Sequence, residues 1–284
     1  MTRSINSCKN TWPRRLKLAN HKVAELLGLR NTKGDVGIEI EMEGKSRFPY
    51  EISKWWKAEE DNSLRGYSVE YVMKKPMPLD LVGDALDLLK EEIQLHGSKP
   101  VYSERAGVHV HVNVQDLTMD QVFCTAMVYY CLEKALVRYC GENREGNHFC
   151  LRVQDADYVL DVIESALIHR NLRFLDTEDI RYASLNFCSL FKYGSIEFRA
   201  METRPDFSKI KEWASMLVAI RNYARELEDY ERIPAELSGS GPTGWARQIL
   251  GDELFNLINY PEFDRDVMRC MRPIQHLFHM KKAA

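Results

Sequence analysis

The sequence predicts an α+β fold in which helices cover a largely antiparallel sheet. Segments with strand-like alternation of apolar residues come in neighbouring pairs and do not alternate regularly with helical segments. Paired strands favour hairpins and antiparallel neighbours, whereas a doubly wound fold would need a helix after nearly every strand. No internal repeat or low-complexity linker divides the chain of 284 residues. This length suits one large domain or two small ones.

Six segments have the apolar alternation and the flanking turn residues of strands. They are residues 36–43, 52–58, 66–73, 107–114, 182–190 and 195–200. We expect residues 59–63 to form the turn between the second and third strands. Gly194 is expected to belong to a short turn that joins the last two strands as a hairpin.

Seven further segments have the apolar spacing or the boundary residues of helices. They are residues 16–29, 78–95, 118–139, 155–169, 208–227, 242–262 and 264–279. The segment 118–139 is rich in apolar and aromatic residues, which is typical of a helix in the core. Thr118 and Gln121 have the spacing of a capping box, and Ser208 is expected to cap the helix that it begins.

The composition is that of an ordinary soluble protein. Hydrophobic residues make up 45% and charged residues 29% of the chain, and no apolar run is long enough to span a bilayer. The first fifteen residues lack the apolar core of a secretory signal. The seven cysteines form no CxxC pair, so we expect reduced thiols and a cytoplasmic protein without a membrane partner.

A basic segment at the N-terminus is the main asymmetry of charge. Residues 1–34 contain eight Lys or Arg residues and one acidic residue, Glu25, although the net charge of the chain is −3. We therefore divide the chain into a basic arm with a short helix (1–34), a catalytic domain (35–230) and a helical C-terminal extension (231–284). A solvated arm is the favoured interpretation, and contact with nucleic acid through it is the less favoured one.

The segment 37–43 alternates apolar and acidic residues along an expected strand. Successive side chains of a strand point to opposite faces, so Glu39, Glu41 and Glu43 should share one face. Neighbouring carboxylates repel one another, and a hard divalent cation such as Mg²⁺ would remove that repulsion. A solvated acidic face on an edge strand is the alternative that this segment alone leaves open.

Three other segments place polar side chains suited to metal or phosphate on one face of a strand or beside it. An ordinary structural role would explain any one of them, but all of them combine an apolar stripe with a charged opposite face. A sheet curved towards the charged face would line a cavity with carboxylates, imidazoles and a guanidinium. The segments are Asp61-Asn62-Ser63 with Glu70, then His109, His111 and Asn113, and finally Glu197 with Arg199.

These motifs together resemble the amidoligase family within the glutamine synthetase and glutamate–cysteine ligase superfamily. The resemblance covers roughly residues 35–225 and keeps the order of the family's motifs, which makes the set specific. A loop around Arg144 resembles the family's short Arg-containing loop less closely. The matching segments are Gly37-Ile38-Glu39-Ile40-Glu41, Asp61-Asn62-Ser63 with Glu70 and Lys75-Pro76, Gly107-Val108-His109-Val110-His111-Val112, Arg181-Tyr182 with Asn186, and Glu197-Phe198-Arg199.

The resemblance implies a curved antiparallel sheet that forms an open, barrel-like active site, with ATP and Mg²⁺, or Mn²⁺, as cofactors. It implies that ATP phosphorylates a carboxylate and that an amine then displaces the phosphate. Glu39, His109 and Glu197 would hold the metal nearest the γ-phosphate, whereas Glu41, Glu70 and Asp61 would hold a metal on the substrate side. Arg199 would hold the transferring phosphoryl group, and Arg181 would hold a phosphate or a substrate carboxylate. The nucleotide would contact His111, Asn113 and Arg144. Glu70 would also take part in catalysis.

The expected partners are a small-molecule or peptide carboxylate and an amine. Neither substrate, the general base nor the oligomeric state follows from the sequence. Two other functions stay open at this point. The first is a metal-dependent hydrolase built on the HxH pair and the carboxylates, and the second is a non-enzymatic protein that binds nucleic acid through the basic arm.

Overall fold

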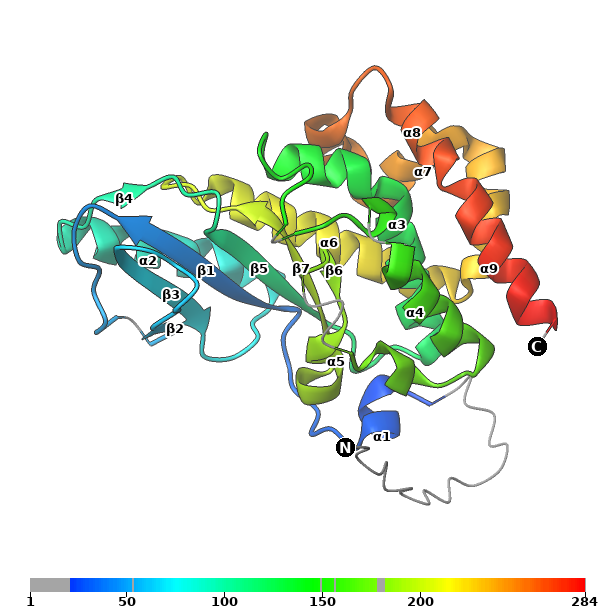
Figure 1. Cartoon of the computed structure of the whole chain (residues 1–284), viewed down its shortest axis with the longest axis horizontal. Helices are drawn as coiled ribbons and strands as arrows, with labels where there is room; N and C mark the ends of the chain where they lie inside the picture. The colour runs from blue at the N-terminus through cyan, green and yellow to red at the C-terminus, as the bar shows by residue number, and fades with distance from the viewer. Residues whose placement is uncertain (1–20, 53, 149, 156, 178–181, 284) are drawn as a thin grey trace, which may run out of the picture.

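The computed structural model describes residues 21–283 except residues 53, 149, 156 and 178–181, and Figure 1 shows the arrangement of the chain. The basic arm that we expected at residues 1–34 therefore lies mostly outside the described residues. Its described part contains the short helix α1 (Val23–Leu27), which ends at Gly28 in the left-handed conformation. The start that we expected for this helix, at residue 16, falls outside the described part.

Seven described strands form a single antiparallel sheet, as the paired strand segments predicted. The strand order is β2-β3-β1-β5-β7-β6. The short strand β4 is outside this order and pairs with the end of β1. The sheet is not closed, because β2 and β6 form its two edges. The strands are β1 (Val36–Gly44), β2 (Trp56–Glu59), β3 (Tyr67–Met73), β4 (Pro100–Val101), β5 (Gly107–Asn113), β6 (Leu185–Asn186) and β7 (Ser195–Glu202).

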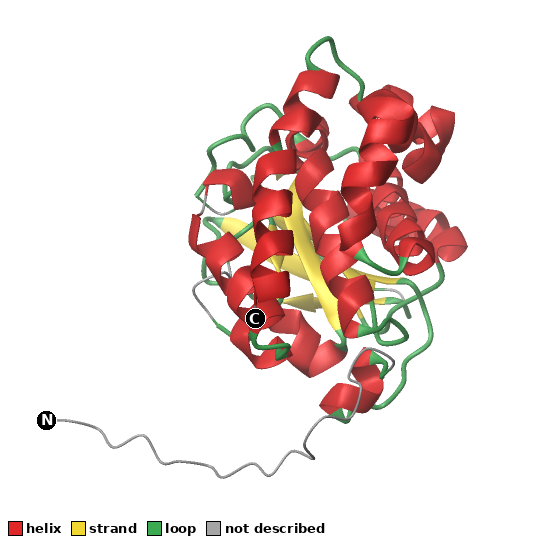
Figure 2. Cartoon of the chain, turned by 90° about the vertical axis from the view of Figure 1, so that its right-hand side faces the viewer, coloured by secondary structure: helices red, strands yellow, loops and turns green. Residues whose placement is uncertain are grey.

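Helices α2 (Val82–Leu95), α3 (Met119–Cys140) and α6 (Ser208–Leu227) pack on the apolar side of the sheet. Figure 2 shows the strands behind a layer of helices. The apolar stripes of the central strands supply the core, and their side chains are almost completely buried. Tyr129 of α3 packs on Phe198 of β7 with ring centroids 4.8 Å apart. Because the apolar stripes are covered, the polar side chains of the same strands must lie on the other face.

Three C-terminal helices continue the helical side of the molecule. They are α7 (Ile233–Ile258), α8 (Phe263–Arg269) and α9 (Met271–Ala283). Helix α7 is broken at Gly241 and Gly251, where φ is 68° and 75°. Helices α7 and α8 pack on α3, and α9 packs on α4 (Asp157–Ile168). None of the helices in the described ranges combines the length and the apolar character that a membrane span requires.

The expected short turn between the two strands of residues 182–200 is wrong, because a helix connects them. Strand β6 pairs with β7 but is only two residues long, and the chain then forms helix α5 (Cys188–Tyr193). The side chain of Asn186 accepts a hydrogen bond from the backbone of Cys188 at 2.9 Å, which starts the helical turn. Gly194 ends it in the left-handed conformation, with φ of 69°. The second expected strand, 52–58, likewise shortens to β2.

The capping of α3 is confirmed, whereas that of α6 is corrected. The backbone of Thr118 donates to Gln121 Oε1 at 2.8 Å, and the backbone of Gln121 donates to Thr118 Oγ1 at 3.3 Å. Ser208 does not cap α6 as expected. Asp206 instead accepts hydrogen bonds from the Ser208 backbone at 3.1 Å and from the Ser208 hydroxyl at 2.9 Å. A carboxylate two residues upstream therefore satisfies the first free N–H group.

Candidate active site

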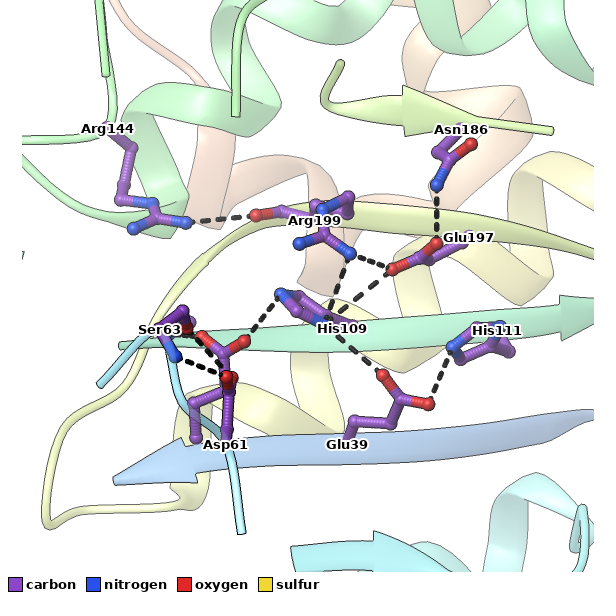
Figure 3. A network of polar contacts seen from close by, with 11 residues as sticks. Glu39, Asp61, Ser63, His109, His111, Arg144, Asn186, Glu197 and Arg199 are labelled. Carbon is purple, nitrogen blue, oxygen red and sulfur yellow. Dashed lines mark hydrogen bonds and ion pairs between the residues drawn. The ribbon is translucent and has the colours of Figure 1, made fainter. Parts of the chain in front are cut away.

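Four neighbouring strands bring the predicted polar residues to one face of the sheet (Figure 3). Their order β3-β1-β5-β7 follows from the antiparallel pairing. The register places Glu41 opposite Glu70, Glu39 opposite His109, and His111 opposite Glu197. Direct partners on one face have side chains within reach of each other. The alternating motifs therefore meet in space although they are up to 158 residues apart in the chain.

A β-bulge in β7 determines which of its side chains reach this face. Val108 and Val110 of β5 pair with Met201 and Phe198, so β7 has one extra residue between the two pairs. Glu197 lies before the bulge and Arg199 lies within it, and both side chains are on the polar face. Beyond the bulge, the side chain of Met201 is buried on the apolar face. Without the extra residue, the alternation of β7 would place Met201 among the carboxylates.

Glu39 and His109 form the centre of the polar face. His109 Nδ1 lies 3.3 Å from Glu39 Oε2 and 3.6 Å from Glu197 Oε1. His111 Nε2 lies 3.3 Å from the other oxygen of Glu39. Two groups of side chains could each hold a metal ion, because the possible ligand atoms within each group all lie within 4.8 Å of one another. The first group is Glu39, His111 and Glu197, and the second is Glu39, Glu70 and His109. Carboxylate oxygen and imidazole nitrogen are suitable ligands for Mg²⁺ or Mn²⁺.

Glu41 extends the cluster towards the end of β1. Its Oε2 accepts a hydrogen bond from the backbone of Gly107 at 2.8 Å, and its Oε1 lies 3.7 Å from His109 Nε2. Burial raises the pKa of Glu41, although His109 and the Gly107 N–H partly offset that effect. Burial, reinforced by the carboxylates of Glu39 and Glu41, raises the pKa of Glu70 to about 8. At this end of the cluster, burial therefore outweighs the stabilisation that nearby positive groups give to the charged carboxylates.

The other carboxylates are stabilised in their charged form. Burial alone would raise the pKa of Glu39, but the imidazoles of His109 and His111 outweigh it and hold that pKa well below its usual range. The side chain of Glu197 is only 6% exposed, and burial again acts to raise its pKa. The Arg199 guanidinium and the two imidazoles reverse this effect, so the pKa of Glu197 is lowered. This side of the cluster therefore keeps its negative charge at neutral pH.

Arg199 stands beside the cluster as its permanent cation. Its Nη1 donates a hydrogen bond to Glu197 Oε1 and lies 3.4 Å from His109 Nδ1. Asn186 Nδ2 donates to the second oxygen of Glu197 at 2.6 Å, so both oxygens of this carboxylate are held (Figure 3). The Nε atom of Arg199 is buried and has no hydrogen-bond partner among the described residues. A ligand oxygen would satisfy this donor.

The comparison with protein families supports the assignment that these motifs suggested. A family model described as "Putative amidoligase enzyme" matches residues 54–221. The chain belongs to this amidoligase family. The matched region contains β3, β5, β6 and β7, whereas β1, with Glu39 and Glu41, precedes it. No protein of curated function matches the sequence. The pairing of β1 between β3 and β5 nevertheless places its carboxylates at the centre of the site.

Arg144 of this amidoligase holds the backbone of β7. Its side chain is buried, and it donates from Nε to the Ala200 carbonyl at 2.8 Å and from Nη2 to the Arg199 carbonyl at 3.0 Å. These two bonds fix the bulged segment that carries the Arg199 side chain. A Cβ atom at Gly107 would lie 3.2 Å from Arg144 Nη2 and 3.4 Å from His109 Nε2, so glycine leaves room for both. Contact of Arg144 with a nucleotide stays a prediction.

Among the described residues, Asp61 and Asn113 lie outside the two groups of possible metal ligands. Asp61 accepts hydrogen bonds from the Ser63 backbone at 2.7 Å and the Ser63 hydroxyl at 2.9 Å. Asn113 Nδ2 donates to the carbonyls of Gly34 at 2.8 Å and Thr32 at 3.2 Å, which holds the chain entering β1. Arg181 is not among the described residues, so its predicted role is untested.

A cavity of about 410 Å³ opens beside Glu39 and His111. Asn113 and Ser195 also line it, and the buried Ser195 hydroxyl has no partner among the described residues. Five basic side chains line this cavity against a single acidic one, Glu39, and we call it the lysine cavity. The sequence analysis did not predict that these basic residues meet, because they come from four separate segments, although Arg30 belongs to the basic arm and Lys75 to a matching motif. They are Arg30, Lys57, Lys74, Lys75 and Lys192.

Proposed function

We propose that this amidoligase is an ATP-dependent ligase that joins a carboxylate to an amine through an acyl phosphate. One observation carries the proposal. Two groups of metal-competent ligands share Glu39 and lie directly beside the Arg199 guanidinium. Phosphoryl transfer needs positioning and charge stabilisation more than covalent chemistry from the protein, and metal ions with an arginine supply both.

The ligand sets fit hard divalent cations in number and chemistry. Glu39, His111 and Glu197 would hold one Mg²⁺ or Mn²⁺ ion, and Glu70 and His109 with Glu39 would hold a second. The high pKa of Glu70 fits such a site, because a cation would stabilise its charged form. Bound ions would neutralise the charge of a triphosphate and polarise its terminal phosphoryl group.

The lysine cavity is where we place the nucleotide. Its basic side chains and the imidazole of His111 suit an anionic ligand, and its apolar wall suits a nucleoside. The wall includes Met73 and Tyr193. The cavity meets the cluster at Glu39, so phosphates bound there would reach the proposed metals. Two residues predicted from the sequence to bind the nucleotide thus line the same cavity.

The proposed reaction has two displacement steps. A carboxylate oxygen of the acceptor attacks the γ-phosphorus of ATP, the bond to ADP breaks, and an acyl phosphate forms. The amine nitrogen then attacks the acyl carbon, the C–O bond to phosphate breaks, and the nitrogen loses its surplus proton to solvent or a base. Arg199 is positioned to stabilise the charge on the transferring phosphoryl group.

The test is a screen of carboxylates and amines for ADP release with Mg²⁺ present, in which mass spectrometry identifies the amide. A ligase should release ADP only when both substrates are present, and Glu39→Ala, His109→Ala and Arg199→Ala should abolish this release. Replacing Lys75 and Lys192 together by Gln should raise the KM for ATP. Bond cleavage without ATP would instead indicate a metal-dependent hydrolase.

A further inference from the structure

The segment 29–34, which connects α1 to β1, forms part of the wall of the lysine cavity, and we call it the strap. Leu29, Arg30 and Thr32 of the strap line the cavity. Figure 1 shows this connection passing beside α5 on its way to β1. None of the described helices and strands includes the strap, so contacts with other segments must hold it in place.

Backbone hydrogen bonds anchor the chain on both sides of the strap. Before the strap, the N–H group of Ala24 in α1 donates to the Gln115 carbonyl at 3.0 Å. After it, the N–H group of Met77 donates to the Val36 carbonyl in β1 at 2.8 Å. These bonds use no side-chain atoms, so they would survive the replacement of a nearby side chain. They leave the position of the middle of the strap to other contacts.

The side chain of Gln115 fixes the middle of the strap to the end of α5. Its Oε1 accepts a hydrogen bond from the Thr32 backbone at 2.8 Å. Its Nε2 donates to the Tyr193 carbonyl at 2.8 Å and to the Arg30 carbonyl at 3.4 Å. Both N–H groups and the oxygen of this amide are therefore used. Gln115 is only 3% exposed, so the surrounding protein shields these bonds from water.

Gly194 leaves the space that this arrangement needs. Its φ is 69°, and a Cβ atom at this position would lie 2.4 Å from Gln115 Cγ and 3.1 Å from Leu29 Cδ1. Gln115 can thus lie between the strap and the end of α5. Through its three hydrogen bonds it joins Arg30 to Tyr193, two residues that line the lysine cavity.

We infer that Gln115 is a positioning residue for the nucleotide, because it holds Arg30 and Tyr193 in the wall of the lysine cavity. This inference rests on the proposed function, which places the nucleotide there. Arg30 is an exposed residue of a segment without regular structure, so its charge needs such an anchor to stay at the cavity. A group that is already in place before the ligand arrives loses less conformational entropy on binding, which increases affinity.

Gln115→Leu tests the inference, because leucine has a similar volume but makes none of the three hydrogen bonds. The probe is adenylyl imidodiphosphate, a non-hydrolysable analogue of ATP, titrated calorimetrically into the full-length protein with Mg²⁺. We expect its affinity to fall at least about tenfold, as for the net loss of one or two hydrogen bonds. In turnover assays, the KM for ATP should rise by a larger factor than kcat falls.

Gln121→Leu is the matched control. Gln121 also joins distant segments, since its Nε2 donates to the Arg225 carbonyl at 2.8 Å and its Oε1 accepts from the Thr118 backbone at 2.8 Å. It does not line the lysine cavity. Both substitutions should lower the stability to urea, but only Gln115→Leu should weaken binding of the analogue.

A double-mutant cycle with Arg30→Gln separates positioning from a general loss of structure. If Gln115 acts through Arg30, then Gln115→Leu should weaken binding by a smaller factor in the Arg30→Gln protein than in wild type. Should Gln115→Leu fail to fold, hydrogen exchange of the wild type gives the answer. The analogue should slow exchange of the Thr32 N–H group, which donates to Gln115.

Any of five results would overturn the inference. They are no binding of the analogue by wild type, equal affinity of wild type and a folded Gln115→Leu variant, equal losses in Gln115→Leu and Gln121→Leu, the same effect of Gln115→Leu with and without the Arg30 side chain, and unchanged exchange at Thr32. Failure of the ligase function is distinguishable, because it appears as a bound analogue without any ATP-dependent amide product. Amide formation with an unchanged KM for ATP in Gln115→Leu would overturn the inference alone.

Discussion

Glu39 and His109 are direct partners in the pairing of β1 with β5, and His109 Nδ1 lies 3.3 Å from Glu39 Oε2. The other oxygen of Glu39 faces His111 at 3.3 Å. Glu39 is consequently the one residue that both groups of possible metal ligands share. Its carboxylate should decide whether the site can hold a metal at all.

Glu39→Gln is expected to reduce the affinity for Mn²⁺ severely. The substitution keeps the size of the side chain but removes the charge that both groups use. Loss of a residue that only supports a metal ligand costs about 10–100-fold in affinity, and loss of a shared ligand should exceed that. Calorimetric titration of the metal-free protein with Mn²⁺ measures the change.

Glu43→Gln is the matched control for this experiment. Glu43 lies on the same strand and the same face, but its Oε1 accepts a hydrogen bond from the Arg65 backbone at 2.8 Å, and it belongs to neither group. Its replacement should leave the affinity for Mn²⁺ nearly unchanged. Equal losses in the two variants would show that general negative charge, and not ligation by Glu39, attracts the ion.

Asn186→Ala should weaken metal binding although Asn186 is not a proposed ligand. Its amide holds one oxygen of Glu197 at 2.6 Å and thereby fixes the orientation of that carboxylate. We expect a loss of about 10–100-fold in Mn²⁺ affinity, as for other residues that orient metal ligands. Asn143→Ala, at an exposed asparagine, is the control. An unchanged affinity would mean that Glu197 keeps its position without this hydrogen bond.

Arg199→Ala should destabilise the metal-free protein, and Mg²⁺ should restore part of the lost stability. The substitution leaves the buried Glu197 carboxylate without its guanidinium partner, a change that typically costs about 3–5 kcal/mol. Urea unfolding with and without Mg²⁺ measures the effect. The interpretation fails if Mg²⁺ stabilises the variant no more than it stabilises wild type.

The stability of the metal-free protein should fall as pH rises towards 8. The pKa of Glu70 is about 8 in the folded protein, against an ordinary value of 4.5 for a glutamate. Between these values the folded state binds more protons than the unfolded state, so raising the pH favours unfolding. Thermal unfolding between pH 6 and pH 9 should show this slope, and Glu70→Gln should reduce it. The stabilisation by Mg²⁺ should grow over the same range, because ligation needs the charged carboxylate.

Much of the polar face could be predicted because a strand alternates strictly. Once residues 36–43 and 107–114 are recognised as strands, Glu39 and Glu41 must share a face, and so must His109 and His111. The capping box at Thr118 and Gln121 was predictable for a similar reason, since it depends on local spacing. Local rules of this kind need no knowledge of distant segments.

Other features depend on which distant segments meet. The bulge in β7 arises where its pairing with β5 changes register, and helix α5 replaces an expected hairpin turn. The basic residues of the lysine cavity come from separate segments that only the fold brings together. No single window of the sequence therefore shows that all five basic residues lie in one cavity.

By itself, the sequence determined the antiparallel class of the sheet, the identity of the charged side chains and the face on which each one lies, because these follow from residue type and the period of a strand. Only the tertiary structure decided that β1 lies between β3 and β5, and hence that Glu39 meets both imidazoles while Asp61 stays apart from the possible metal ligands. Strand order and register depend on long-range packing of the apolar faces, which local patterns do not encode.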